Sequence, residues 1–241
     1  MKRTAKALLT AFSLFALAAP ALSTPSTQIW IPSTDIQAYG VTHLTVDSYI
    51  RTSQDDPYFP PVFVFGPTIG VLPYEKIQME VGFDLIYNGV PEYDSHPIYG
   101  HLKIGTPEGS MFESSPALAV GGYNFGTEKD LTNQNIIYGL VAKNIPVLGR
   151  LSVGYYQGNE DVLGDDDSGI LASWDRSLPE ISDKLWAAID YQGGDNALGA
   201  LSFGFSYAFA PNASVIFGYD MYNDNDIAGE DTYTVQVDLN F

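Results

Sequence analysis

The sequence predicts an all-β fold: an antiparallel, up-and-down transmembrane β-barrel of about twelve strands. Three observations lead to this fold class. The chain begins with a basic and apolar segment typical of secretion, alternates apolar and polar residues through many segments, and sorts its charges between two sets of connections. Segments of about ten alternating residues separated by turns are the sequence signature of membrane barrels. Ten and fourteen strands remain alternatives.

The first element is a predicted signal peptide over residues 1–23. Three bases open it, Lys2, Arg3 and Lys6, and an apolar run with small residues after it follows. This order is typical of a cleaved secretory signal. We expect cleavage between Ser23 and Thr24, or alternatively between Ala21 and Leu22. The run is shorter than the roughly 20 apolar residues of a spanning helix, and no later stretch reaches that length, which excludes a helical membrane protein.

The next element, residues 24–40, is expected to be a periplasmic lead-in, with residues 28–32 as an alternative extra strand. Residues 41–241 are expected to form the outer-membrane barrel, because apolar and polar residues alternate there between turn residues. The predicted strands cover about residues 41–51, 62–70, 76–87, 97–104, 116–125, 135–143, 149–158, 169–176, 184–192, 199–209, 213–222 and 232–241.

Apolar stripes justify these strands in order along the chain. The longest stripe runs from Ile77 to Tyr87 at every second position, opposite a polar row. Similar stripes occupy alternate positions in 151–155, 185–191, 201–209 and 213–221. Because strand side chains alternate between faces, each segment has one apolar and one polar face. A buried sandwich rarely carries such polar inner rows, so the pattern favours lipid on one side and water on the other.

The last ten residues alternate throughout. Apolar side chains occupy one face: Tyr233, Val235, Val237, Leu239 and Phe241. Threonine, glutamine, aspartate and asparagine occupy the other face. The chain ends on an aromatic residue with no charged tail, which suits a strand with one face in lipid.

Composition limits the partners of the chain. Removing the three bases of the signal leaves 8 Lys and Arg against 29 Asp and Glu, a formal charge of −21. This balance argues against nucleic acid, whose phosphates recruit basic stripes, and against docking on anionic lipid through basic patches. The absence of cysteine excludes disulfides and thiol lipidation. The 16 Tyr, 13 Phe and 23 Gly match a twisted sheet with aromatic girdles.

Charge placement distinguishes the two ends of the predicted barrel. More than half of the acids fall in the connections that face away from the C-terminus, at about residues 52–61, 88–96, 126–134, 159–168, 193–198 and 223–231. Six bases lie at or beside the opposite strand ends: Lys76, Lys103, Lys143, Arg150, Arg176 and Lys184. A soluble sandwich has no reason to sort charges this way, whereas a membrane barrel has distinct outer and periplasmic rims.

In these features the chain resembles bacterial outer-membrane β-barrel proteins of the porin-like class, which belong to Gram-negative bacteria. The resemblance rests on the signal, the alternating segments and the terminal pattern at 233–241. It implies an outer-membrane location, contact with lipid and lipopolysaccharide, and recognition of the terminal strand by the outer-membrane assembly machinery. A homo-oligomer is compatible with it. Such a class resemblance implies location and fold more strongly than activity.

The polar strand faces nominate the residues of the lumen. The inward-facing candidates are His43, Asp47, Arg51, Lys76, Glu80, Asp84, His101, Lys103, Arg150, Trp186, Asp190, Asp220 and Asp238. Twelve strands fall between barrels filled by side chains and barrels that hold a water-filled channel, so a narrow pore and a closed lumen both remain open. An acidic mouth concentrates cations.

We therefore expect a passive, mildly cation-selective channel for ions or small hydrophilic solutes, without a cofactor. One alternative is a non-conducting barrel that serves as a surface scaffold, adhesin or complex subunit. A scaffold predicts a lumen blocked by charged pairs between Glu80 or Asp84 and Lys103 or Arg150, whereas a channel predicts an open path lined by them. An outer-membrane hydrolase is the third alternative.

The sequence nominates no catalytic residue and only weak metal ligands. Outer-membrane phospholipases carry a compact His and Ser motif that this sequence lacks, so a hydrolase would need a tight constellation around one of the three histidines. Clustered carboxylates suit hard cations such as calcium. The weak calcium candidates are Asp165, Asp166, Asp167, Asp224 and Asp226. Neither group completes a known calcium loop, and a solvated surface is the expected role.

Overall fold

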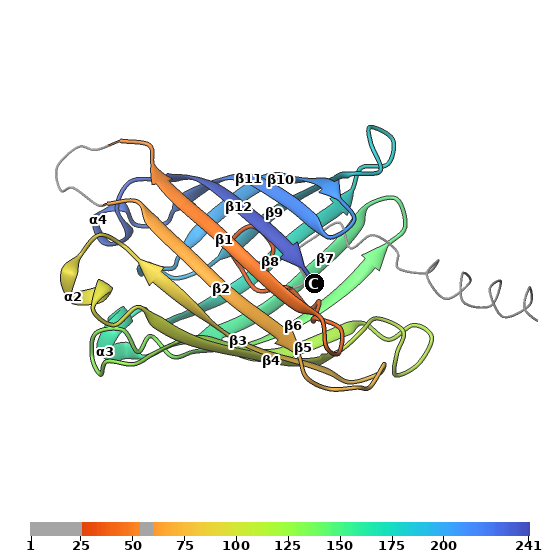
Figure 1. Ribbon diagram of the computed structural model, residues 1–241, viewed down its shortest axis with the longest axis horizontal. Helices are drawn as coiled ribbons and strands as arrows, with labels where there is room; N and C mark the ends of the chain where they lie inside the picture. The colour runs from red at the N-terminus through yellow and green to blue at the C-terminus, as the bar shows by residue number, and fades with distance from the viewer. Residues whose placement is uncertain (1–25, 54–59) are drawn as a thin grey trace, which may run out of the picture.

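The computed structural model describes residues 26–53 and 60–241, so the predicted signal and its cleavage site lie outside the described residues. Twelve antiparallel strands close into one barrel, each beside its neighbours in the sequence (Figure 1). Their bounds are β1 Thr42–Arg51, β2 Val62–Gly70, β3 Gln78–Tyr87, β4 Ile98–Thr106, β5 Ala117–Gly126, β6 Ile136–Ile145, β7 Gly149–Gln157, β8 Ser168–Ser177, β9 Leu185–Gln192, β10 Ala200–Ala210, β11 Ala213–Tyr222 and β12 Thr232–Asn240. The predicted all-β barrel and its twelve strands are confirmed.

Strands β1 and β12 close the barrel. Leu44 pairs with Leu239, and Ile50 pairs with Tyr233. Apolar residues of the first and last strands therefore share the outer face. A slip of one residue would turn this apolar set into the lumen, so the alternation in the sequence fixes the register of closure.

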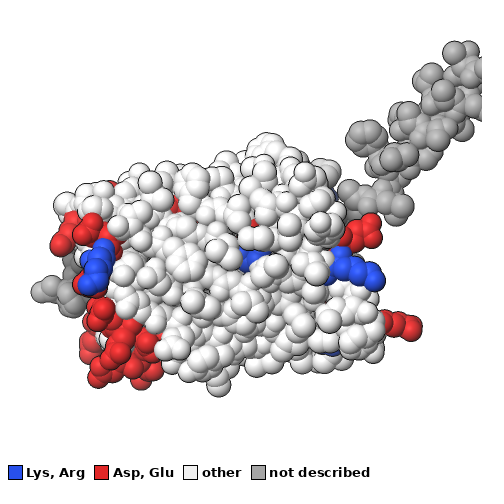
Figure 2. Space-filling model, turned by 90° about the horizontal axis from the view of Figure 1, so that it is seen from below, with Lys and Arg blue, Asp and Glu red and all other residues white. Residues whose placement is uncertain are grey.

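Large apolar side chains cover the outside of the barrel. Aromatic rings pack against each other across neighbouring strands: the centroids of Phe205 and Phe217 are 5.6 Å apart, and those of Tyr219 and Tyr233 are 5.1 Å apart. Tyr233 is 58% exposed. Figure 2 shows a broad belt with little charge between two charged ends. An apolar surface of this extent is typical of a wall that faces lipid.

Three short helices lie in connections at one end of the barrel: α2 (Pro91–Asp94), α3 (Glu160–Leu163) and α4 (Asn225–Ala228). We call this the loop end, and the opposite end, where the chain stops at Phe241, the terminal end. Acidic residues gather at the loop end (Figure 2). Across the described ranges, none of the helices has the length and apolarity that crossing a membrane requires.

Candidate functional site

The inner wall of the barrel carries most of the nominated lumen residues. A cavity that runs along the inner wall from the loop end, which we call the loop-end cavity, is lined by His43, Asp47, Arg51, Glu80, Asp84, His101, Lys103 and Asp238. A second cavity at the terminal end is lined by Arg150 and Trp186. Asp190 and Asp220 are buried on the inner wall. Lys76 differs from the expectation, because β3 begins only at Gln78 and Lys76 lies exposed in the connection before it.

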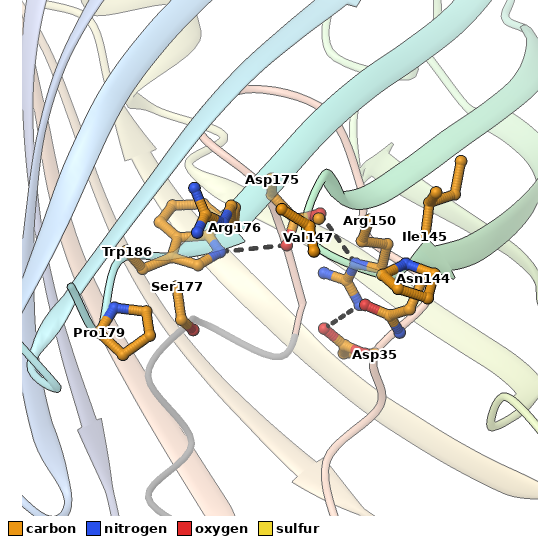
Figure 3. Close-up of a pocket in the computed structure, with 12 residues that line it drawn as sticks. Asp35, Asn144, Ile145, Val147, Arg150, Asp175, Arg176, Ser177, Pro179 and Trp186 are labelled. Carbon is orange, nitrogen blue, oxygen red and sulfur yellow. Dashed lines mark hydrogen bonds and ion pairs between the residues drawn. The ribbon is translucent and has the colours of Figure 1, made fainter.

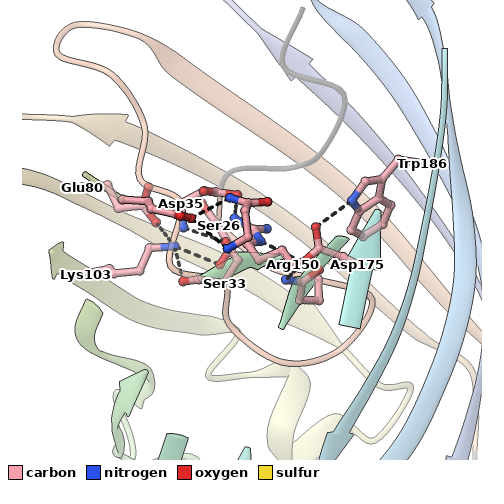
Figure 4. Close-up of polar contacts among 11 residues, drawn as sticks. Ser26, Ser33, Asp35, Glu80, Lys103, Arg150, Asp175 and Trp186 are labelled. Carbon is pink, nitrogen blue, oxygen red and sulfur yellow. Dashed lines mark hydrogen bonds and ion pairs between the residues drawn. The ribbon is translucent and has the colours of Figure 1, made fainter. Parts of the chain in front are cut away.

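Residues 26–40, which we call the lumen segment, fold back inside the barrel (Figures 1 and 4). Two wall carboxylates hold its first turn. Asp190 accepts hydrogen bonds from the backbone N–H groups of Ile29 at 2.7 Å and Trp30 at 3.1 Å. Asp175 accepts one from the side-chain amide of Gln28 at 3.0 Å. These contacts satisfy backbone and side-chain donors that the barrel hides from water.

Charged residues on β3 and β4 hold the two ends of the same turn (Figure 4). The Lys103 ammonium donates to the carbonyl oxygens of Ser26 at 3.0 Å and Ser33 at 3.3 Å. It also forms an ion pair of 3.1 Å with Glu80, which accepts the backbone N–H of Gln37 at 2.7 Å. Because Glu80 and Lys103 lie on adjacent strands, their pair runs along the wall and does not cross the lumen.

Arg150 provides a third polar attachment. Its guanidinium donates to Asp175 at 2.8 Å on the neighbouring strand and to Asp35 of the lumen segment at 2.6 Å. The Trp186 indole N–H donates to the other oxygen of Asp175 at 3.1 Å (Figure 4). Charge-assisted hydrogen bonds of this kind are roughly twice as strong as neutral ones. The segment is therefore held by wall groups from several strands.

Apolar side chains dock the lumen segment between these polar contacts. Ile29 is buried in a cluster with Trp186 and Ile216. Two glycines of the wall make room for it: a Cβ added at Gly218 would lie 2.8 Å from the Ile29 side chain, and one at Gly204 would lie 3.1 Å from it. At Gly218 the nearest atom to an added side chain would belong to Ile29, whereas at Gly204 the backbone of β11 is closer still, so the close approach of the segment accounts best for Gly218.

Residues of the lumen segment line both cavities: Asp35 lines one, and Ser26, Thr27, Trp30 and Pro32 line the other. The terminal-end cavity has a volume of about 630 Å³ and lies beside Arg150, Asp175 and the β6–β7 hairpin (Figure 3). The loop-end cavity has a volume of about 390 Å³. It is bounded by Trp30 and Pro32 of the segment and by residues of the loop-end connections, such as Leu198 and Ile227. The indole N–H of Trp30 donates to the Leu198 carbonyl at 2.8 Å, which ties the segment to the β9–β10 connection.

Two histidines of the loop-end cavity are held by carboxylates. His101 lies 3.0 Å from Asp84 through Nδ1 and 2.8 Å from the Thr68 hydroxyl through Nε2. His43 lies 3.3 Å from Asp238 and 3.1 Å from Asn240. The order carboxylate, imidazole and hydroxyl occurs in nucleophilic catalytic sites. In this row, however, the hydroxyl is a strand threonine of which only 4% is exposed.

An ion pair between β6 and the β4–β5 connection fastens the terminal-end rim. Lys143 lies 2.8 Å from Glu108 of the β4–β5 connection, and the backbone N–H of Asn144 donates to the same carboxylate at 2.9 Å. Burial alone would raise the pKa of Glu108, but the hydrogen bonds from Lys143 and Asn144 lower it below its usual value. The charged form of Glu108 is therefore the form that stabilises this rim.

The weak calcium candidates have structural partners at the loop end. Asp224 accepts the backbone N–H of Asp226 at 2.9 Å and so caps α4. Asp166 accepts the backbone N–H of Asp195 at 2.7 Å. Over the residues that the structure describes, no three His, Cys, Asp or Glu side chains lie close enough together to hold a metal ion.

Sequence reasoning missed the lumen segment. Residues 24–40 were expected to be a periplasmic lead-in or to contain an extra strand, whereas residues 26–40 form only isolated bridges, Thr27 with Pro32 and Tyr39 with Gly70. The physical reason is that the segment buries its apolar residues against the inner wall. The signal for this was the run Ile29 to Ile31 beside a proline, together with inward-facing glycines on β10 and β11.

Comparison with known proteins supports the fold. No protein-family model matches the chain, and no curated protein matches it in sequence. An outer membrane channel from Pseudomonas putida aligns over 88% of this chain and 100% of its own, with a TM-score of 0.52 and 12% identity. The KdgM porin aligns over 83% of this chain and 99% of its own, with a TM-score of 0.51 and 8% identity. The chain therefore has the barrel fold of outer-membrane porins and channels.

Proposed function

We propose that this protein is a porin-like outer-membrane channel through which ions or small hydrophilic solutes diffuse passively, with a mild preference for cations. The observation that carries the proposal is a polar lumen with two cavities, inside a closed wall whose outer face is apolar. Such a wall shields a polar solute in the lumen from the surrounding lipid while the solute crosses the membrane. The acidic loop end is assigned to the cell exterior, and the terminal end to the periplasm.

The lumen segment sets the bore of the proposed channel. Its residues line both cavities, so a solute would pass beside it or wait for it to move. Its attachments through Asp190, Lys103 and Arg150 are all noncovalent. A conductance well below that of a barrel with an empty lumen of equal strand number follows from this geometry.

The charges of the loop-end cavity support cation preference. Among the described residues, its lining includes four carboxylates, Asp47, Glu80, Asp84 and Asp238, and two permanent bases, Arg51 and Lys103. An excess of negative charge in a low-dielectric cleft attracts cations and repels anions. Salt weakens the effect, because the Debye length is about 10 Å at 0.1 M. Selectivity should therefore be strongest at low ionic strength.

Planar-bilayer recording of the refolded protein tests the proposal. A salt gradient across the bilayer should give a reversal potential of the sign that marks cation preference. Asp47→Asn with Asp84→Asn should reduce this potential, whereas Asp183→Asn, an exposed change at the terminal end, should leave it unchanged. Absence of conductance in the wild type, or anion preference, would overturn the channel.

A non-conducting barrel is the second candidate, and the lumen segment is the observation that favours it. In this alternative the acidic loop end is the working surface, and the lumen is permanently filled. The two candidates differ in the behaviour of the wild type. A scaffold conducts only after residues 26–40 are deleted, whereas a channel conducts before the deletion and conducts more after it.

The row formed by Asp84, His101 and Thr68 favours the third candidate, a hydrolase. In that reading His101 would accept the Thr68 proton while the hydroxyl oxygen attacks an ester carbonyl, and would return this proton to the departing alcohol. Water would then hydrolyse the acyl-threonine to the free acid. Hydrolysis of p-nitrophenyl esters by the wild type, lost in Thr68→Val, would support it. Equal rates in the wild type and Thr68→Val, which we expect, would leave the row a structural hydrogen-bond network.

A further inference from the structure

The loop-end cavity brings carboxylates and aromatic rings together. We propose that this cavity binds small organic ammonium ions that carry an apolar group, such as arylalkylamines, and is the point at which the channel selects its solutes. The inference rests on the proposed function, because the ligand reaches the cavity as a solute that enters from the loop end. The proposed function includes a mild preference for cations in general, and this inference names one class of cation that the cavity binds.

Three carboxylates of the cavity come from nearby strands: Asp47 on β1, Asp84 on β3 and Asp238 on β12. Between β1 and β3, strand β2 contributes Gly66 at this level, and the Asp84 carboxylate occupies the space that a side chain there would fill. Thr45 pairs with Gly66 on one side and with Asp238 on the other. The strand register therefore concentrates negative charge on one stretch of the wall.

One of these carboxylates has an unused acceptor. The Asp238 side chain is only 2% exposed, and one of its oxygens lies 3.3 Å from His43. Its other oxygen, Oδ2, has no hydrogen-bond partner among the described residues. A buried carboxylate oxygen without a donor is costly, and it is strongly favoured to accept a hydrogen bond from a cation. The N–H groups of an ammonium ion supply such donors.

Aromatic rings adjoin the carboxylates. Trp30 of the lumen segment packs edge-to-face against Tyr49 at 5.4 Å and Tyr222 at 5.6 Å between ring centroids. The guanidinium of Arg51 already lies 5.3 Å from the centroid of Tyr222, within the range of a cation–π contact. The contact between Arg51 and Tyr222 illustrates how a ring of this cavity would hold the ammonium group of an organic cation.

The remaining lining favours an organic ion over a bare metal ion. Val62, Leu198 and Ile227 add apolar surface to the cavity. Its volume of about 390 Å³ lies in the range of small-molecule sites. Among the described residues no group of His, Cys, Asp and Glu has the spacing of a metal site. The ammonium group would face the carboxylates, and the apolar group would face the rings and aliphatic side chains.

Calorimetry on the full mature chain, folded in detergent, tests the site. The probes are phenethylammonium, neutral 2-phenylethanol and anionic 3-phenylpropionate, which share a ring and differ in charge. We expect phenethylammonium to bind and the anion not to bind. Asp47→Asn should weaken binding by about tenfold or more, as expected for a charge-assisted hydrogen bond. Tyr49→Leu should weaken it by about threefold to tenfold.

A matched control uses an acid of the same end. Asp226→Asn changes an exposed carboxylate outside the cavity and should bind phenethylammonium as the wild type does. Block of single-channel current by phenethylammonium, applied at the loop end, is the second readout. Equal binding of the three probes, or equal loss in Asp226→Asn and Asp47→Asn, would overturn the site. Selective binding without any conductance would support the site and overturn the channel, which separates the two proposals.

Discussion

Release of the lumen segment should enlarge the conducting path, and Ile29→Ala combined with Asp190→Ala is the perturbation that achieves it. Ile29 is buried against Trp186, Ile216 and two wall glycines, so its truncation should cost about 2–5 kcal/mol of docking free energy. Loss of the Asp190 carboxylate leaves the backbone N–H groups of residues 29 and 30 without an acceptor, at about 1–3 kcal/mol each.

These terms act on the docked state only, because the same groups meet water when the segment leaves the wall. A change of about 1.4 kcal/mol alters an equilibrium constant tenfold. Even the lower bound of about 2 kcal/mol for Ile29→Ala therefore lowers the equilibrium constant for docking by roughly 30-fold. Lys103 and Arg150 still hold the segment, so we expect frequent release and not complete loss of docking. When the segment is released, we expect the cavities of about 630 and 390 Å³ to join, because segment residues line both.

Single-channel recording is the assay for this double variant. We expect openings of higher conductance than in the wild type, and a barrel that still resists unfolding in detergent. Both substitutions truncate side chains and leave the backbone pairing of Asp190 with Ser202 and Ser173 in place. Ile181→Ala is the matched control, since this isoleucine is 70% exposed at the terminal end. Conductance of the double variant equal to that of the wild type and the control would refute the role of these anchors.

Three further predictions concern other contacts. Gly218→Val should raise conductance by displacing Ile29 from the space beside Gly218, whereas Gly139→Ala, whose added Cβ meets no atom within 4 Å, should not. Equal conductance of the two variants would contradict the role of Gly218 in docking Ile29. Deletion of Phe241 should lower the yield of folded barrel in the outer membrane, and an unchanged yield would argue against its role in assembly. Because the Glu108 pKa is depressed, its stabilisation is present above the usual glutamate pKa and lost as pH falls. After correction for the intrinsic pH dependence of exchange, the protection factors of rim amides should therefore fall on acidification in the wild type but not in Glu108→Gln.

The wall of the barrel was predictable because a strand period of two leaves a direct record in the sequence. Phe205 and Phe217 alternate with small or polar residues, and the structure places them together on the outer face. Inward positions such as Asp84 and Lys103 follow from the same period. The prediction that Lys76 faces the lumen was wrong, because the alternating pattern begins earlier in the sequence than the backbone pairing of β3, which starts at Gln78.

The lumen segment was not predictable from periodicity, because it has none. Its position depends on long-range contacts, such as Ile29 with Gly218 and Gln28 with Asp175, that join residues far apart in the chain. The pairing of Arg150 was likewise hidden, since Asp35 comes from the segment and not from a strand. A wall glycine that faces inward is the signal that marks such a contact, as Gly218 illustrates.

Disulfide trapping tests the central claim most directly, namely that residues 26–40 occupy the lumen. The native chain has no cysteine, so the Ile29→Cys, Gly218→Cys double variant contains a single possible bond. The close approach of Ile29 to the Gly218 position places the two sulfurs within bonding reach. Mass spectrometry of the oxidised, folded protein should find the two peptides linked in most molecules. Absence of the link in a correctly folded barrel would contradict a docked lumen segment.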